Sequence, residues 1–196
     1  MAVKPILNIE NPVLRRKTAR VSKIDKSILR LVDDLTDTLE VADGVGLAAP
    51  QIGSSLRVAV LWLPDEKPFA IINPEVIKRI GVREVEEACL SLPGYQGCIK
   101  RSVSVTVKCL GLDGRPMKIR AMDLLSHALE HEIDHLDGVL YIDHLESPNK
   151  LQKVKSQKDK TEEKLASAES MGNAVYANDL ENNCARERLC NLDVLY

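Results

Sequence analysis

The chain of 196 residues carries 27 basic and 29 acidic side chains, a formal net charge of -2, and 44% of its residues are hydrophobic. These values are typical of a globular protein and exclude collagen-like, membrane-spanning and intrinsically disordered chains. Because the charges are balanced, the protein has no strong positive electrostatic field that would favour DNA as a partner. One Trp, four Tyr and one Phe are too few for stacking on single-stranded nucleic acid.

Two features of the sequence indicate where the protein works. Its five cysteines are an odd number without the dense spacing of a disulfide scaffold, which indicates a reducing compartment. Residues 1–20 contain two prolines and no apolar run long enough for a signal peptide or a membrane span. We therefore expect a cytoplasmic protein with no membrane partner.

The first half of the chain is predicted to begin with a helix and to continue as strands. Apolar residues at steps of three and four predict a helix from about Asp25 to Ala42, ended by Gly44. Short β-prone runs follow, separated by prolines and glycines, and each predicts a strand. These runs are RVAVLWL, FAIIN, EVIKRI and VREVEEACLSL.

The next part of the chain is predicted to form a hairpin and a buried helix. Alternating valines from Val103 to Val107 indicate a half-buried strand, and Asp113-Gly114 offers a turn back into the strand PMKIRA. The segment MDLLSHALEHEIDHLDG returns to helical spacing, is apolar on most sides, and ends at Gly138. We therefore predict an α+β fold in which antiparallel or mixed sheets pack around this central helix.

The composition changes after residue 149. Residues 150–169 hold six lysines and four acidic residues with few apolar positions, which predicts a solvated helix. Residues 170–196 have no clear periodicity, which predicts a loosely ordered extension. We expect one folded domain at residues 1–149 and a charged C-terminal extension at residues 150–196.

The string His131-Glu132-Ile133-Asp134-His135 matches the pattern H-E-x-x-H. Two imidazoles one helical turn apart point the same way and can bind one metal ion. A carboxylate beside them can take a proton from a water that the metal activates. The motif predicts a hydrolase with His131 and His135 as ligands and Glu132 as general base. The alternative is a pair of hydrogen-bonded core histidines.

A third protein ligand is needed if one coordination position is to stay open for water and substrate. His127 lies on the same helical stripe, but it is ~12 Å along the helix from His135, too far for one ion to bind all three histidines. The metzincin pattern fails because Tyr141 stands where it needs a histidine, and His144 comes three residues too late. Cys89 is the other candidate, although a half-buried cysteine is more often inert packing.

Three segments together resemble motifs of the peptide deformylase family in their order and spacing. They are GVGLAAPQ at residues 44–51, EACLS at residues 87–91 and HEIDH at residues 131–135. They are similar to the family patterns G-x-G-x-A-A-x-Q, E-G-C-L-S and H-E-x-D-H, and the resemblance extends from the N-terminus to about residue 150. Ala88 stands where the family usually has glycine, and its Cβ is expected to crowd a substrate backbone or to restrict φ.

The resemblance implies a catalytic domain that removes formate from the N-formylmethionine of nascent peptides. The implied metal ligands are Cys89, His131 and His135. Glu132 is implied as general base and then general acid, with the Gln51 amide and the backbone N–H of Leu90 as donors to the oxyanion. The ligand types alone suit zinc, iron, cobalt or nickel, whereas the resemblance implies one Fe(II) per chain.

The resemblance also implies where the peptide lies. The residues expected to flank an extended peptide are Val45, Gly46, Glu87 and Ala88. His127, one turn before the ligands, is a plausible wall for the methionine side chain, and we expect it to alter side-chain selectivity. Glu87 and Arg101 are expected to form a supporting pair, which is worth under about 1 kcal/mol if it is exposed.

Two other functions are compatible with the metal motif. A zinc peptidase would cleave internal amides and ignore the formyl group. A metal-stapled binding module would close the coordination shell with a fourth protein ligand such as His144 or Cys98. The lysine-rich segment after Lys150 is a candidate contact with ribosomal RNA, although a solvated face is the simpler interpretation.

Overall fold

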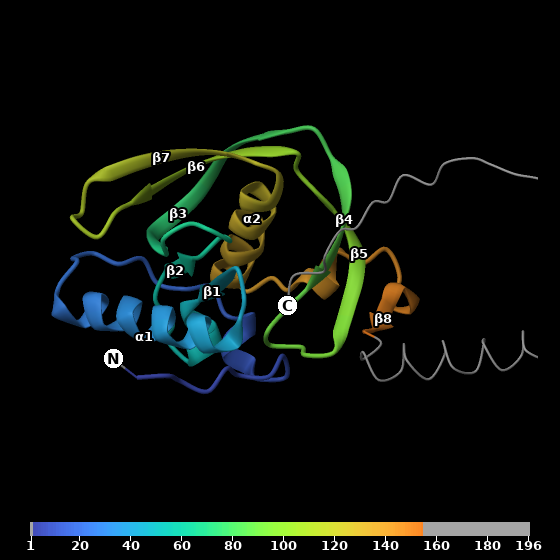
Figure 1. Ribbon diagram of the computed structural model, residues 1–196, viewed down its shortest axis with the longest axis horizontal. Coiled ribbons are helices and arrows are strands. Elements are labelled where there is room, and N and C mark those ends of the chain that lie inside the picture. Colours follow the sequence, from blue (N-terminus) through green and yellow to red (C-terminus); the bar gives the residue numbers. More distant parts are fainter. Residues whose placement is uncertain (1, 155–196) are drawn as a thin grey trace, which may run out of the picture. The chain divides into compact units, whose positions relative to one another are not determined.

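Two sheets and two α-helices make up residues 2–154, the part of the chain that the computed structural model describes (Figure 1). The helices are α1 (Lys26–Ala42) and α2 (Asp123–Asp137). The strands are β1 (Gly46–Ala48), β2 (Val58–Leu61), β3 (Phe69–Ile80), β4 (Arg83–Ala88), β5 (Tyr95–Arg101), β6 (Ser104–Leu110), β7 (Pro116–Met122) and β8 (Leu151–Lys153). Within these residues no helix has the length and apolar character needed to cross a bilayer.

The central position of α2 confirms the predicted α+β fold. The first sheet has the strand order β1-β2-β3-β6-β7 and the second has the order β4-β5-β8. α2 contacts every strand of the first sheet and lies in the middle of the described residues in Figure 1. Val105 and Val107 of β6 share a buried core with Leu129 and Leu136 of α2. The apolar face that the helical spacing predicted is therefore the face that packs on the sheet.

α1 begins and ends close to the predicted positions. The side chain of Asp25 caps its first turn and the helix ends at Ala42. The left-handed residue after it is Asp43, with φ of 55°, and not Gly44 as expected. Gly44 instead packs closely, since a Cβ there would lie 2.9 Å from the end of the Leu90 side chain, which would have to shift.

β3 corrects the prediction of two separate strands. FAIIN and EVIKRI join in the single strand Phe69–Ile80, with Pro74 inside it. The register against β6 shifts between Ile72 and Glu75, and Asn73 has a positive φ of 53°. At such an irregularity the hydrogen bonds between neighbouring strands are interrupted. A proline, which has no backbone N–H to donate, can therefore lie inside the strand at this point.

Three strands are absent from the predicted elements. β1 is too short to have a periodicity, and β5 follows the Pro93-Gly94 turn without a clear alternation. At residues 151–153, where the composition favours a helix, the chain forms the short strand β8. Residues 155–196, the remainder of the expected extension, lie outside the described residues.

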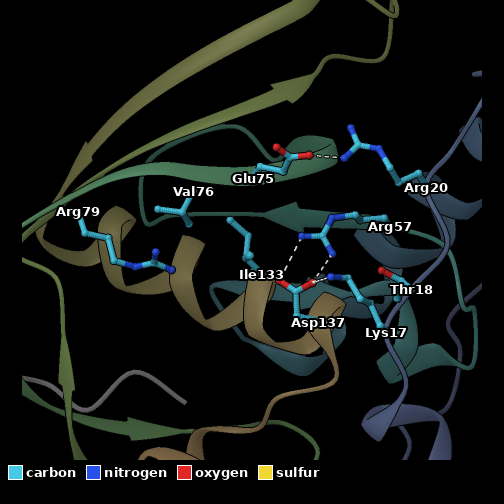
Figure 2. Close-up of a pocket in the computed structure, with 9 residues that line it drawn as sticks. All are labelled: Lys17, Thr18, Arg20, Arg57, Glu75, Val76, Arg79, Ile133 and Asp137. Carbon is cyan, nitrogen blue, oxygen red and sulfur yellow. Dashed lines mark hydrogen bonds and ion pairs between the residues drawn. The ribbon is translucent and has the colours of Figure 1, made fainter.

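A cavity of about 480 Å³ lies beside the C-terminal half of α2, on the side that carries Ile133 and Asp137 (Figure 2). Its cationic side chains each contact a carboxylate: Lys17 and Arg57 contact Asp137, Arg20 contacts Glu75, and Arg79 contacts Glu130. The buried guanidinium of Arg57 also donates to the carbonyls of Pro74 and Leu136. Arg57 therefore fastens the end of α2 to β3.

The turn after α2 depends on Gly138. Its φ is 76°, and a Cβ there would lie 2.7 Å from the backbone oxygen of Arg15. Gly138→Ala is expected to lower the free energy of unfolding by about 2–4 kcal/mol, from left-handed strain and from this contact. Denaturant titration measures the loss. Gly94→Ala is the matched control, since Gly94 has φ of 79° with nothing within 4 Å of a Cβ; equal losses in the two variants would contradict the role of the contact.

Candidate metal centre

Three buried side chains meet at one point. Sγ of Cys89 lies 3.2 Å from Nε2 of His135, and the ligand atoms of Cys89, His131 and His135 all lie within 4.8 Å of one another. One thiol and two imidazoles are a donor set that zinc, iron, cobalt and nickel bind. It is the one such group found within residues 2–154, and it brings together the three residues named as ligands from the sequence.

The ligands come from two elements that lie far apart in the sequence. α2 carries His131 and His135 one turn apart, so that both rings share a face. Cys89 follows directly after β4 of the second sheet. The exposed fractions of the three residues are 3% for Cys89, 7% for His131 and 1% for His135. Because little water reaches them, charges at this point interact strongly.

The surroundings of Cys89 favour its thiolate. Burial alone would raise the pKa of Cys89, but the imidazoles of His135 and His131 outweigh burial and hold this pKa well below its usual value. The backbone N–H of Ser91 donates to Sγ at 3.4 Å, and the amide nitrogen of Gln51 lies 3.7 Å from it. The thiolate is the form of cysteine that binds a metal.

Glu87 orients one of the two imidazoles. Nδ1 of His131 lies 2.6 Å from Oε1 of Glu87, which leaves Nε2 of that ring for a metal. The expected pair of Glu87 with Arg101 is present, but it is buried, with side chains 0% and 4% exposed. Arg101 also contacts Asp134 at 2.6 Å. Removing one partner of a buried pair costs about 3–5 kcal/mol, so this pair matters more than the exposed one that the sequence suggested.

Glu132 stands beside the ligands with one oxygen unpaired. The residue is 2% exposed, and burial raises its pKa to about 7 against the opposing charges of His131 and His135. Its Oε2 is buried and has no hydrogen-bond partner among the described residues. Buried polar atoms normally have a partner, so this oxygen fits a site that is completed by a bound group.

The two predicted donors, Gln51 and the backbone N–H of Leu90, are found beside Cys89. Oε1 of Gln51 accepts a hydrogen bond from the backbone N–H of Ala48 at 2.8 Å, while its amide nitrogen faces Cys89 and Ser91. Leu90 directly follows Cys89, and within residues 2–154 its backbone N–H donates no hydrogen bond. Both groups are therefore neutral donors on the cysteine side of the cluster.

The other candidate ligands lie elsewhere. His144 bonds Asp134 at 2.8 Å, Cys98 is exposed on β5, and His127 faces Glu87 at 2.5 Å. None of the three joins the cluster. The described residues thus offer three candidate ligands to a metal, and the fourth ligand that a closed structural site requires is not among them.

The residues expected to flank a peptide lie at the edges of the sheets. β1 and β4 are each the first strand in their sheet's order. Ala88 ends β4 and is not among the described non-glycine residues with positive φ, so the expected restriction of φ by its Cβ is absent. The side chain of Glu87 faces the ligands, which leaves only its backbone for a peptide. The Val45 carbonyl, just before β1, accepts a hydrogen bond from Trp62 at 2.9 Å.

Three features of the centre are not predicted from the motifs. Gly46 packs under Glu132: a Cβ there would lie 2.8 Å from Cδ of Glu132 and closer still to Oε1. Ser91 donates its backbone N–H to the thiol. His127 and His131 both bond the carboxylate of Glu87. The spacing of four residues between the two histidines is the one sequence signal for this arrangement.

Three candidate ligands on buried elements, with an unpaired carboxyl oxygen beside them, form the kind of site that metal-dependent hydrolases use. Residues 3–151 match the family described as polypeptide deformylase. The chain belongs to the polypeptide deformylase family.

Individual relatives agree with this assignment. The chain is 47% identical over 164 residues to a peptide deformylase of Dehalococcoides mccartyi, covering 83% of this chain and 98% of that protein. It is similar to the crystal structure of a peptide deformylase from Legionella pneumophila, with a TM-score of 0.73 and 36% identity over 90% of this chain and 100% of the other. A Met-Ala-Ser bound crystal structure of a class I type b peptide deformylase from Acinetobacter baumannii has a TM-score of 0.71 and 28% identity, over 74% and 99% of the two chains.

Proposed function

We propose that this chain removes the formyl group, as formate, from the N-formylmethionine of newly made polypeptides in the cytoplasm. The observation that carries the proposal is the cluster of Cys89, His131 and His135 with Glu132 beside it, in a member of the polypeptide deformylase family.

The metal is proposed to be Fe(II), one per chain, with Zn(II), Ni(II) or Co(II) able to replace it. The two imidazoles and the thiolate suit any of these ions. Such an ion, when bound, lowers the pKa of a water molecule and polarises a carbonyl oxygen. Because iron and thiolate both react with oxygen, metal analysis of protein purified without oxygen identifies the ion.

Glu132 is proposed to move the proton. Its unpaired Oε2 is the acceptor for a proton of the water that attacks the formyl carbon. As the C–N bond breaks, Glu132 delivers that proton to the leaving nitrogen, so formate and a free amine are formed. Gly46 supports this role, since the absence of a side chain there leaves room for the Glu132 carboxyl group.

Gln51 and Leu90 are proposed to bind the oxyanion that develops on the formyl oxygen. The Gln51 amide is already oriented by Ala48, and the Leu90 N–H has no other acceptor within the described chain. Donors that are fixed before the reaction contribute most where charge develops, and one such donor is worth about 3–4 kcal/mol in comparable sites.

The peptide is proposed to lie as an extended strand between β1 and β4. Val45 and Gly46 would meet it on one side, and the backbones of Glu87 and Ala88 on the other. Edge strands carry unpaired backbone groups that an extended peptide can pair with, and both strands are edges. The Met-Ala-Ser peptide bound by the Acinetobacter baumannii relative supports a peptide ligand.

Formate release tests the function directly. The Fe, Ni and Zn forms of the full chain are given formyl-Met-Ala, and formate is measured in a coupled assay. We expect formate from each form, with the Fe and Ni forms faster than the Zn form. Cleavage of internal peptide bonds without formate release would contradict the proposal and favour the zinc peptidase.

Gly46→Ala tests the space around Glu132. The added Cβ displaces the Glu132 carboxyl group. The misplaced carboxyl group is expected to lower kcat for formyl-Met-Ala about 100-fold, with metal content unchanged. Gly111→Ala is the control, because its Cβ would meet the flexible end of Met117 at 2.9 Å, in the β6–β7 hairpin. A Gly46→Ala enzyme with unchanged kcat would contradict the placement of Glu132.

The ribosome contact stays a proposal, since most of the lysine-rich segment lies outside the described residues. Deleting residues 155–196 is expected to weaken co-sedimentation with ribosomes at low salt, where phosphate contacts are strongest. Undiminished co-sedimentation would contradict this contact.

A further inference from the structure

The carboxylate of Glu87 accepts four hydrogen bonds. Oε1 lies 2.6 Å from Nη2 of Arg101 and 2.6 Å from Nδ1 of His131. Oε2 lies 2.8 Å from Nε of Arg101 and 2.5 Å from Nε2 of His127. A carboxylate offers about four lone-pair positions. The four donors therefore occupy every acceptor position of this fully buried side chain.

The donor roles follow from Arg101. Its guanidinium stays protonated and donates to both oxygens, so the carboxylate of Glu87 is an acceptor for all its neighbours. The nitrogens of His127 and His131 that face it therefore carry hydrogen.

His127 and His131 reach the same carboxylate from one helix. They are four residues apart on α2, so their side chains lie one above the other on one face. Arg101 approaches from β5 and is held in turn by Asp134. Arg101 and the two rings together fix both the position of the carboxylate and the plane in which it lies.

We propose that His127 is a positioning residue of the metal centre. By holding Oε2 of Glu87 it keeps Oε1 on Nδ1 of His131, and the His131 ring then presents Nε2 to the metal. The proposal rests on the metal site of the proposed function, but it differs from the expectation that His127 only shapes the pocket for the methionine side chain. The side chain of His127 is 18% exposed, and its polar edge is directed at Glu87.

Removing the ring leaves a buried oxygen with one donor fewer. In His127→Leu, Oε2 keeps only the hydrogen bond from Arg101, and the carboxylate is free to turn away from His131. Loss of a hydrogen-bond partner around a metal ligand typically lowers metal affinity about 10–100-fold. His127→Gln places an amide N–H near the position of Nε2, so it is expected to restore most of the effect.

The test measures metal retention rather than activity. The Zn-loaded full chain and its variants are mixed with a chromophoric chelator, and the rate of Zn(II) transfer is followed. We expect His127→Leu to lose Zn(II) about tenfold faster than the unsubstituted chain and His127→Gln to lie close to the latter. His144→Leu is the comparison variant, because His144 bonds Asp134, which also holds Arg101, but is 36% exposed and makes no bond to Glu87 itself; we expect its rate to change less than that of His127→Leu.

Several outcomes separate the possibilities. Unchanged Zn(II) transfer in His127→Leu, with an altered preference between formyl-Met and formyl-norleucine peptides, would overturn the positioning role and assign His127 to the pocket wall. Equal Zn(II) transfer rates for His127→Gln and His127→Leu would also overturn it. Thermal unfolding of each variant is recorded, so that a loss of stability is not mistaken for a loss of metal affinity. If the unsubstituted chain released no formate but the Zn(II) rates followed the expected order, the positioning role would stand and the proposed function would fail.

Discussion

Glu132→Gln is expected to lower kcat for formyl-Met-Ala about 1,000-fold while metal content stays near that of the unsubstituted chain. An amide has nearly the shape of a carboxyl group, but it cannot take the proton of the attacking water, and general acid–base groups contribute about 100- to 10,000-fold. The substitution should not unfold the protein, because burial already disfavours the charged form of Glu132 and the amide is neutral. Steady-state formate release and metal analysis of the same sample measure the two quantities.

Glu130→Gln on the same helix is the matched control. Glu130 is buried like Glu132, but its carboxylate accepts hydrogen bonds from Ser102 and Arg79 and makes none with Cys89, His131 or His135. Its replacement is expected to change stability more than kcat. A Glu132→Gln enzyme that kept kcat within about tenfold of the unsubstituted value would contradict the role of general base.

The metal centre could be predicted because each part of it lies in a short local string. His131 and His135 share a face by helical spacing alone, so their convergence follows once the segment is recognised as a helix. Cys89 was a candidate on its residue type only, and the family resemblance made it the expected third ligand. The distance of 3.2 Å between its Sγ and His135 depends on how β4 lies against α2, which no local pattern describes.

The features that were missed depend on tertiary packing. Pro74 looks like the end of a strand in the sequence, but a register shift against β6 lets β3 continue through it. Asp43 takes the left-handed position expected of Gly44, while a Cβ on Gly44 would meet the side chain of Leu90, a neighbour that lies far away in the sequence. The pair of Glu87 and Arg101 is visible as a charge complement in the sequence, whereas its burial, which decides its energy, is not.

The same distinction applies to Gly46. In the sequence it is a glycine in a loop, and the natural interpretation is close approach of a peptide. The structure adds a second constraint from inside the protein, the carboxyl group of Glu132. A side chain at position 46 would therefore meet Glu132 whether or not a peptide is bound, and spacing in one motif cannot reveal a neighbour that stands 86 residues further along the chain.

Cys89→Ala is expected to abolish metal binding at a stoichiometric metal concentration. Loss of a hydrogen-bond partner of a ligand already lowers affinity about 10–100-fold, and loss of one of three ligands should exceed that range. The other described cysteines are controls with different surroundings. Burial raises the pKa of the Cys109 thiol to about 11, so it stays protonated, while Cys98 is exposed and outside the cluster.

Equilibrium dialysis with Zn(II) at micromolar protein measures the loss. Cys98→Ala and Cys109→Ala are both expected to bind Zn(II) as the unsubstituted chain does, because neither thiol belongs to the cluster with His131 and His135. Retained binding in Cys89→Ala would mean that the two imidazoles find their third ligand elsewhere, and the convergence of β4 on α2 would then serve packing alone. Because Cys89, the candidate thiolate ligand, directly follows β4 of the second sheet, the metal is also expected to bind the two sheets together, so Zn(II) should raise the melting temperature of the unsubstituted chain and leave that of Cys89→Ala unchanged.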